Sequence, residues 1–259
     1  MKIQSVHSLR LRAAAKASAL HFLASVAVAV CAGLLVFGLW YPSPFQAISG
    51  GRELFVLIVG VDIVCGPLLT LVLFNPKKPR AELVRDLMLV VVIQIAALGY
   101  GLWTVWEARP IFLVHEVDRF KPVALADIED GAIELLPANL KPSWFSKPIT
   151  VGIREPIDLE EKKKVLFESV QGGRDYGERP EFYLPYNGDV ALKAVTRAKP
   201  LDQFLNKYPD QRSAATELAL KKGGDMAQWL YLPVRGREDW VAIVDKQGQI
   251  QGFLKGDGF

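Results

Sequence analysis

Residues 60–70 read GVDIVCGPLLT and lie within an apolar run from about residue 54 to residue 74. A run of this length can cross a bilayer, because a transmembrane helix takes about 20 apolar residues. Asp62 lies near the middle of the run, where a carboxylate costs roughly 2.5–3.5 kcal/mol on insertion scales and so needs a proton or a partner. One turn later, Pro67 removes a backbone donor and follows Gly66. The pair predicts a helix that bends and packs closely against a neighbour.

Apolar residues are concentrated in the first half of the chain. They make up 51% of its 259 residues, and the excess over a soluble protein is confined to residues 17–106. Residues 1–106 hold nine Lys and Arg against four Asp and Glu, whereas residues 107–259 hold 22 against 24. The net charge of +3 therefore comes from the flanks of the apolar runs, and the composition gives no indication of nucleic-acid binding.

Two further apolar runs accompany the first. Residues 17–40 follow a basic N-terminus, residues 1–16, and are longer than the apolar part of a secretory signal peptide, which has about 7–15 residues. We predict three transmembrane helices, at about 17–40, 54–74 and 87–106, followed by an outer domain at 107–259.

Basic residues indicate the orientation of these helices. Residues 77–85 hold four Lys and Arg between the second and third runs, whereas the loop at 41–53 holds only Arg52. The positive-inside rule places the N-terminus and residues 77–85 in the cytoplasm, and residues 107–259 outside it. Tryptophans at the outer ends of the first and third runs agree with this orientation.

Small and polar residues indicate how the helices pack. Ser25, Ala29 and Gly33 recur every fourth residue, a spacing that lets helix backbones approach closely, either within the bundle or against a foreign helix. Gln94 lies near the middle of the third run, at about the depth of Asp62. Two arrangements are open: Asp62 is protonated and hydrogen-bonded to Gln94, or it faces a partner helix or a water pocket.

The outer domain is predicted to have an α+β fold with antiparallel strands and helices between them. Strands are expected near residues 111–117, 149–153, 228–235, 239–244 and 250–254, the last two forming a hairpin. Asp158 is expected to cap a helix at 159–170. Shorter helices are expected near residues 189–196, 200–207 and 210–222.

The residue types of most catalytic and metal sites are scarce in the outer domain. Its one histidine is His115, it has no cysteine, and no glycine pair has the context of a nucleotide-binding loop. The acidic residues at 116–130 lack the spacing of a calcium loop and are interpreted as a solvated face. We therefore predict no enzyme activity, no catalytic residue, no metal and no cofactor.

Aromatic loops are the remaining candidates for a binding surface. Trp144 and Phe145 lie in a proline-rich loop, and Phe182 and Tyr183 lie in a second loop after Pro180. Such rings either dock a protein partner or fill the core of the domain. We take these four residues, together with the edge of the final hairpin, as candidate docking elements.

Several stretches together have a recognisable pattern: WYP (40–42), GVD (60–62), GPLLT (66–70), FNPKK (74–78), YGLWT (100–104), ARP (108–110) and EVDRF (116–120). In combination they resemble the TfpX/TfpZ family of type IV pilin accessory proteins. The similarity is strongest over residues 15–120, and the layout of three spans and an outer domain resembles that family over the whole chain.

The resemblance implies an inner-membrane, non-enzymatic accessory protein or chaperone of Gram-negative bacteria, with its outer domain in the periplasm. The implied partners are a cognate type IV major pilin, the lipid bilayer and other inner-membrane proteins of pilus assembly. The resemblance identifies no active site, so no catalytic residue is carried over.

Two other functions remain open from the sequence. A membrane-anchored periplasmic enzyme would need polar residues that converge near the outer interface, for which Glu107, Arg109, Glu116 and Asp118 are the candidates. A sensor or transporter subunit would need a ligand site or an ion path. Three spans with one buried charge are too few for such a path without oligomerisation.

Overall fold

The computed structural model describes residues 2–259, with side chains from Arg10 onward. Met1 and the side chains of residues 2–9, Lys2 among them, lie outside the described part of the predicted basic N-terminus. The chain forms two compact units, which are described separately. One unit contains the residues up to Gly38 and Gly51–Trp106, and the other contains Leu39–Gly50 and Glu107–Phe259.

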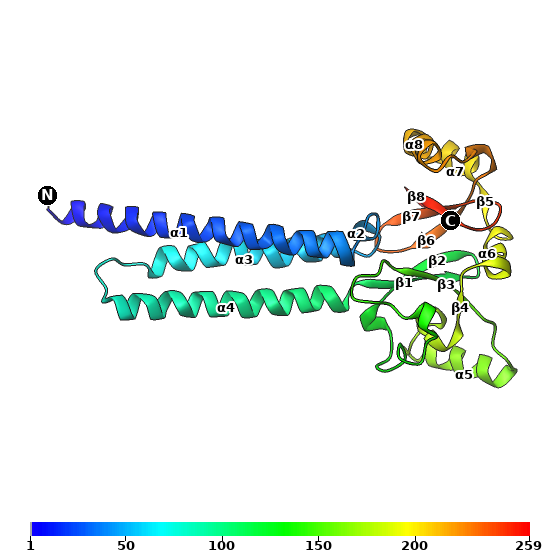
Figure 1. Cartoon of the computed structure of the whole chain (residues 1–259), viewed down its shortest axis with the longest axis horizontal. Helices are drawn as coiled ribbons and strands as arrows, with labels where there is room; N and C mark the ends of the chain where they lie inside the picture. Colours follow the sequence, from blue (N-terminus) through cyan, green and yellow to red (C-terminus); the bar gives the residue numbers. More distant parts are fainter. Residues whose placement is uncertain (1) are drawn as a thin grey trace. The chain divides into compact units, whose positions relative to one another are not determined.

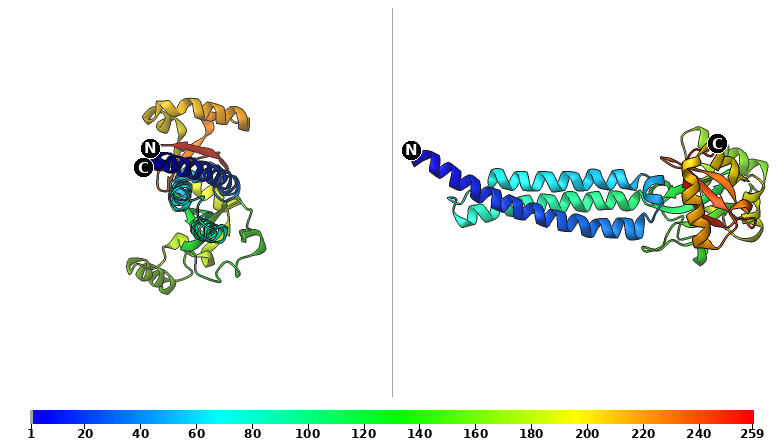
Figure 2. Two further views of the ribbon diagram at one scale, coloured as in Figure 1. Left: turned by 90° about the vertical axis from the view of Figure 1, so that its left-hand side faces the viewer. Right: turned by 90° about the horizontal axis from the view of Figure 1, so that it is seen from above.

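Three long helices make up the first unit and lie side by side (Figures 1 and 2). They are α1 (Lys2–Leu35), α3 (Gly51–Leu73) and α4 (Arg80–Glu107), and a π-helical turn, η1 (Val36–Trp40), follows α1. All three helices are long and apolar enough to cross a membrane. The predicted set of three transmembrane helices is therefore confirmed as three candidate spans.

Two of these helices begin earlier than the apolar runs alone predict. α1 begins at Lys2 instead of residue 17, and α4 begins at Arg80 instead of residue 87. Residues 80–86 are mostly good helix formers, and Pro79 precedes them in the position where proline favours a helix start. Lys78 also pairs with Glu82 and Asp86, at 3.3 and 2.7 Å, which holds the first turns of α4.

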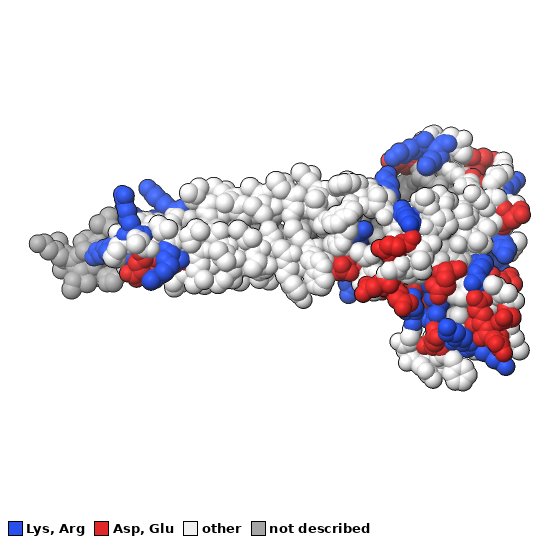
Figure 3. All heavy atoms as spheres, turned by 60° about the horizontal axis from the view of Figure 1, so that its bottom comes forward, with Lys and Arg blue, Asp and Glu red and all other residues white. Residues whose placement is uncertain are grey.

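Charged side chains are confined to the ends of the helical unit on the face shown in Figure 3. Lys and Arg gather at the end where α3 and α4 are joined, and the middle of the bundle carries none of the four charged residue types on this face. In the three helices, large apolar side chains such as Leu57, Leu89 and Ile95 are more than half exposed. A surface of this kind is stable in hydrocarbon and not in water.

The second unit is built on an eight-stranded mixed sheet with the order β4-β3-β1-β2-β6-β7-β8, and β5 pairs with β6. The strands are β1 (Pro110–Glu116), β2 (Arg119–Ala124), β3 (Ile149–Ile153), β4 (Tyr183–Pro185), β5 (Lys199–Pro200), β6 (Leu230–Arg235), β7 (Asp239–Val244) and β8 (Ile250–Lys255). The pairs β1–β3 and β2–β6 are parallel and the others are antiparallel. The α+β class is confirmed, with a mixed sheet instead of a purely antiparallel one.

Four helices accompany the sheet: α5 (Leu159–Val170), α6 (Gly188–Val195), α7 (Leu201–Lys207) and α8 (Arg212–Lys222). They lie close to the predicted positions. Asp158 caps α5, as predicted, because its carboxylate accepts a hydrogen bond from the Glu161 backbone N–H at 2.7 Å. Strand β1 is buried on both faces: Leu113 packs into one core cluster, and Phe112 and Val114 pack into another.

The segment between the first two spans belongs to the core of the second unit. Its short helix α2 (Phe45–Ile48) places Phe45 and Ile48 in the cluster that contains Phe120 and Leu232. The Arg237 backbone N–H donates to the Ile48 carbonyl at 2.7 Å. We predicted only a loop at 41–53, so the structural unit differs from the predicted continuous domain at 17–106. Burial of the segment's apolar residues explains the difference.

His115 is an interior residue of β1, with 7% of its surface exposed. Its ring packs beside Phe120 and Tyr186, with centroids 5.2 and 6.0 Å apart. Burial lowers the pKa of the His115 imidazole from 6.5 to about 4, because a charged ring is poorly solvated there.

We expect this buried ring to make the second unit less stable in acid. Between pH 6.5 and 4 the unfolded imidazole binds a proton and the folded one does not, so folding stability falls as pH falls, by up to roughly 3 kcal/mol. Unfolding of the full chain in detergent, followed from pH 7 to pH 4, should show a smaller pH-dependent loss for His115→Gln than for the wild type. Identical pH profiles of the two proteins would contradict the assignment.

Candidate functional site

Each of the three spans carries a polar residue near its mid-length. Asp62 is the middle residue of α3, Gln94 lies at the middle of α4, and Ser25 lies at the middle of the candidate span Arg10–Trp40. The three residues line one cavity. The sequence predicted the matching depths of Asp62 and Gln94, and the structure adds Ser25 to the same site.

Gln94 binds Asp62 through its side-chain amide. Its Nε2 donates to the Asp62 carboxylate oxygen Oδ1 at 3.1 Å and lies 3.2 Å from the Asp62 backbone carbonyl. The Gln94 Oε1 atom is buried and has no hydrogen-bond partner among the described residues. Of the two arrangements left open by the sequence, the structure therefore has the hydrogen bond, and it also places Asp62 at the wall of a cavity.

A second polar set joins α1 to α3. The His21 Nδ1 and Thr70 Oγ1 atoms are 2.6 Å apart, and the Ser18 hydroxyl donates to the Pro67 carbonyl at 2.8 Å. His21, Ser18 and Thr70 were not predicted from the sequence to join helices. They could have been recognised as polar residues inside apolar runs, where hydrogen bonds between helices help to fix the packing.

Glycine allows the closest contacts of α4 with α3. A Cβ atom at Gly66 would lie 2.1 Å from the Gln94 Nε2 atom, and a Cβ atom at Gly101 would lie 2.4 Å from the Ile58 Cγ2 atom. Both glycines are buried, as is Pro67. α3 remains one α-helix through Pro67. Gly66 thus provides the space that the Gln94 side chain occupies while it binds Asp62.

The small residues of α1 differ in their surroundings. Ser25 is 6% exposed, whereas Ala29 and Gly33 are partly buried. A Cβ atom at Gly33 would be 3.4 Å from the Phe55 ring of α3, which is an ordinary packing distance. Gly33 therefore contacts a neighbour within the bundle, the first of the two alternatives given for this spacing.

The cavity at this site has a volume of about 260 Å³. Its lining residues come mainly from α1 and α4, with Asp62 as the one contribution of α3: His21, Ala24, Ser25, Val28, Asp62, Val91, Gln94, Ile95 and Leu98. Asp62 is the only carboxylate among them. The Asp62 carboxylate gives the cavity a hydrogen-bond acceptor in an apolar setting, where polar contacts are strong.

The predicted aromatic docking residues divide into two groups. Trp144 and Phe145 are 67% and 72% exposed, but Phe182 and Tyr183 are 2% and 6% exposed. The prediction that the second loop presents aromatic rings is wrong for Phe182 and Tyr183. Tyr183 lies on β4 against Phe112 in the core, and its hydroxyl donates to the Gly177 carbonyl at 2.7 Å.

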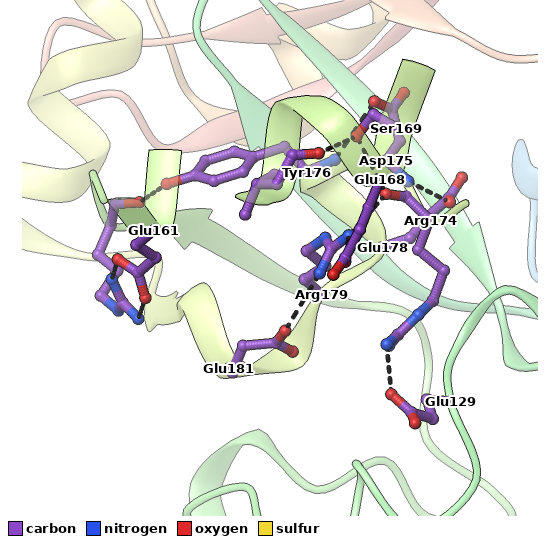
Figure 4. A network of polar contacts seen from close by, with 12 residues as sticks. Glu129, Glu161, Glu168, Ser169, Arg174, Asp175, Tyr176, Glu178, Arg179 and Glu181 are labelled. Carbon is purple, nitrogen blue, oxygen red and sulfur yellow. Dashed lines mark hydrogen bonds and ion pairs between the residues drawn. The ribbon is translucent and has the colours of Figure 1, made fainter. Parts of the chain in front are cut away.

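Helix α5 is held to its unit by charged side chains (Figure 4). The Arg154 guanidinium donates to both oxygens of Glu161 at 2.8 and 2.9 Å, and the buried Arg179 donates to Glu168 at 2.6 Å. Val165 is the one buried residue of α5. The exposed side of the helix mixes charged residues with large apolar ones that are more than 60% exposed: Leu159, Leu166, Phe167 and Val170.

The four candidates for an enzyme site do not come together. Glu116 and Asp118 line a cleft at the end of β1, whereas Glu107 and Arg109 lie before the beginning of that strand and are not among the lining residues. Among the described residues, no group of three or more His, Cys, Asp or Glu is placed to hold a metal ion.

These features are those of a membrane protein with three candidate spans, a polar site among them and a second unit built on a mixed sheet. Over 250 residues the chain is 34% identical to the serogroup I fimbrial assembly protein of Dichelobacter nodosus, covering 95% of this chain and 96% of that protein. The serogroup E1 protein of the same organism matches with the same identity and coverage. The chain therefore belongs to the fimbrial assembly protein family.

Shorter matches agree with this assignment. The pattern of the fimbrial assembly protein FimB family matches residues 9–50. The fimbrial assembly protein of serogroups C1 and C2 of Dichelobacter nodosus is 44% identical over 115 residues, which cover 44% of this chain and 88% of that protein. No solved structure matches the chain.

We expect Gly66→Ala to weaken the contact between α3 and α4. The added methyl group must displace the Gln94 side chain, and loss of its hydrogen bond to Asp62 should reduce stability by about 0.5–2 kcal/mol. Thermal unfolding of the detergent-solubilised protein measures this change. Gly60→Ala is the matched control on the same helix, because no atom lies within 4 Å of the added methyl. Equal effects of the two substitutions would contradict the proposed contact.

Proposed function

We propose that this chain is an accessory protein of the bacterial inner membrane that binds a cognate type IV major pilin and influences pilin stability or pilus assembly. Membership in the fimbrial assembly protein family supports a role in pilus assembly, and the TfpX/TfpZ resemblance supports the more specific role of a pilin chaperone. The observation that carries the proposal is the Asp62–Gln94 pair beside a cavity in an otherwise apolar bundle. The proposed role is not enzymatic.

A pilin that waits in the membrane presents one apolar helix in the bilayer and a globular head outside it. We propose that the apolar helix lies along α1 and α4, over the cavity with Asp62 at its floor. This place is away from Gly66 and Pro67, where the sequence predicts a bend of the second span, since α1 and α4 provide eight of the nine lining residues. Asp62 and Gln94 would accept a hydrogen bond from the bound helix.

The outer unit is proposed to hold the pilin head. Trp144 and Phe145 are exposed aromatic residues, which are frequent in protein interfaces. Strand β8 is an edge of the sheet and pairs only with β7 among the described strands, so its free backbone groups can pair with a partner strand. Other inner-membrane proteins of pilus assembly are further proposed partners of the same unit.

We propose that the N-terminus and residues 77–85 are cytoplasmic and that the outer unit is periplasmic. The charge pattern supports this orientation. A second observation supports it as well: Leu39–Gly50 and Glu107–Phe259 form one unit, so the first loop and the C-terminal part must lie on the same side of the membrane.

This orientation predicts the labelling of single cysteines by a membrane-impermeant maleimide. In a chain with Cys31→Ala and Cys65→Ala, Lys163→Cys on α5 should react in cells with a permeable outer membrane. Lys77→Cys should react only after lysis. Lys163 and Lys77 are both exposed, so neither result depends on unfolding. The reverse pattern would contradict the orientation.

Pilin binding is tested by co-purification of the full chain, in mild detergent, from cells with and without the major pilin. We expect pilin to be recovered with the wild type and with Val64→Ala, a control in α3 at a residue with 54% exposure. Asp62→Ala should reduce recovery at least several-fold, because the bound helix loses its acceptor. Absence of pilin from the wild-type sample would contradict direct binding. Unchanged recovery with Asp62→Ala would contradict only the proposed contact of Asp62 with the pilin helix, and not pilin binding itself.

Exchange of the outer unit for that of a relative tests which part selects the pilin. The exchange must include residues 39–50 together with 107–259, because Phe45 and Ile48 complete its core. Recovery of the relative's pilin in place of the cognate one would assign selectivity to this unit.

A further inference from the structure

A large cleft lies at the end of β1, where the chain turns into β2. Its volume is about 860 Å³. It is lined by residues of β1, β2, the end of β3 and the segment after it, Asp175 and Tyr176, the end of α6 and the residues that follow it, and the end of β6. All of these elements belong to the outer unit. The cleft includes none of the intramembrane residues, so an inference about it is independent of pilin binding at Asp62.

Five Lys and Arg and four Asp and Glu line the cleft, an excess of one positive charge. Lys193 lies 4.0 Å from Glu155, and Asp175 is paired with Lys121. Arg119 is paired with Asp118 at 2.7 Å, and Arg154 is paired with Glu161 at 2.8 Å. Arg197 and Arg235 also line the cleft, and neither has an ion pair within 4 Å among the described residues. Two guanidinium groups are thus available to a ligand.

The acidic residue Glu116 also lines the cleft, but it is not an ion-pair partner of Arg235. Its Oε1 atom packs against Gly177, where a Cβ atom would come within 2.3 Å. Burial raises the pKa of the Glu116 carboxyl, and the nearby charges of Lys121, Arg119 and Arg235 oppose this rise while Asp175 adds to it. Among the described residues no ion pair within 4 Å joins Glu116 to Arg235, so the Arg235 guanidinium keeps donors free for a second carboxylate.

His115 contributes an unsatisfied polar atom to the same cleft. The residue is 7% exposed, it lines the cleft, and its Nε2 atom is buried without a hydrogen-bond partner among the described residues. A buried ring nitrogen of this kind ordinarily has a partner, because an unmade hydrogen bond costs about 1–3 kcal/mol. Because His115 lines the same cleft as Arg197 and Arg235, a molecule bound there is a candidate for the missing partner.

We propose that this cleft binds an acidic peptide segment of a partner protein, with a carboxylate held by Arg197 and Arg235 and a polar group of the peptide bonded to the His115 Nε2 atom. Arginine is suited to this role because its planar fork matches a carboxylate. The volume is far larger than one carboxylate requires. Val117, Ile153 and Pro156 also line the cleft and can contact apolar parts of a peptide, which favours a chain segment over a small anion.

The test uses the purified full chain in detergent and a dye-labelled octapeptide that carries two glutamates among glycine, serine and valine. Fluorescence anisotropy should show at least tenfold tighter binding than for the same peptide with glutamines. Arg197→Ala combined with Arg235→Ala should weaken binding of the glutamate peptide at least tenfold. Lys163→Ala combined with Lys164→Ala removes the same charge from exposed positions on α5 and should have no effect.

Several results would overturn the proposal. These are equal binding of the two peptides, an equal loss in the α5 control, or complete competition by inorganic phosphate at the concentration at which the peptide binds. Arg197→Lys with Arg235→Lys separates charge from geometry, since it should restore binding only in part. A normal thermal unfolding profile of each variant shows that it is folded.

Discussion

The hydrogen bond from Gln94 to Asp62 joins α4 to α3 at the centre of a bundle whose surroundings are apolar. A carboxylate at this position is tolerated only with a proton or a partner, so the register of the two helices follows from it. Gly66 must then lack a side chain, because the Gln94 amide occupies the space beside it. The Gln94 and Asp62 side chains point toward each other, and the cavity lies beside them between α1 and α4.

The sheet unit depends on a different constraint, which is the burial of a segment from far earlier in the chain. Phe45 and Ile48 pack in one core cluster with Phe120 and Leu232, so this core is complete only when the segment between the first two spans joins the C-terminal part of the chain. The family match at residues 9–50 covers most of α1 and this segment, so it includes residues of both units.

Much of the architecture could be read from the sequence, because length and periodicity determine spans, strands and helices. The shared depth of Asp62 and Gln94 also followed from counting residues. Contacts between distant segments could not be predicted in this way. Nothing local indicated that Ile48 joins the sheet core, that Phe182 is buried beneath the Arg154 side chain, or that Arg197 and Arg235 meet at one cleft. These placements depend on the order of strands in the sheet, which a single sequence does not reveal.

Helix α5 reverses the usual arrangement of an amphipathic helix: Glu161 and Glu168 face the protein, and Leu166 and Phe167 face outward. Its attachment therefore consists mainly of ion pairs, whose strength falls as ionic strength rises, while the sheet beneath is held by apolar burial that salt does not weaken. Helix α5 is thus attached mainly by charge to a sheet that is stabilised by apolar burial. The contacts of α5 with its unit should therefore weaken with rising salt more than the contacts within the sheet do.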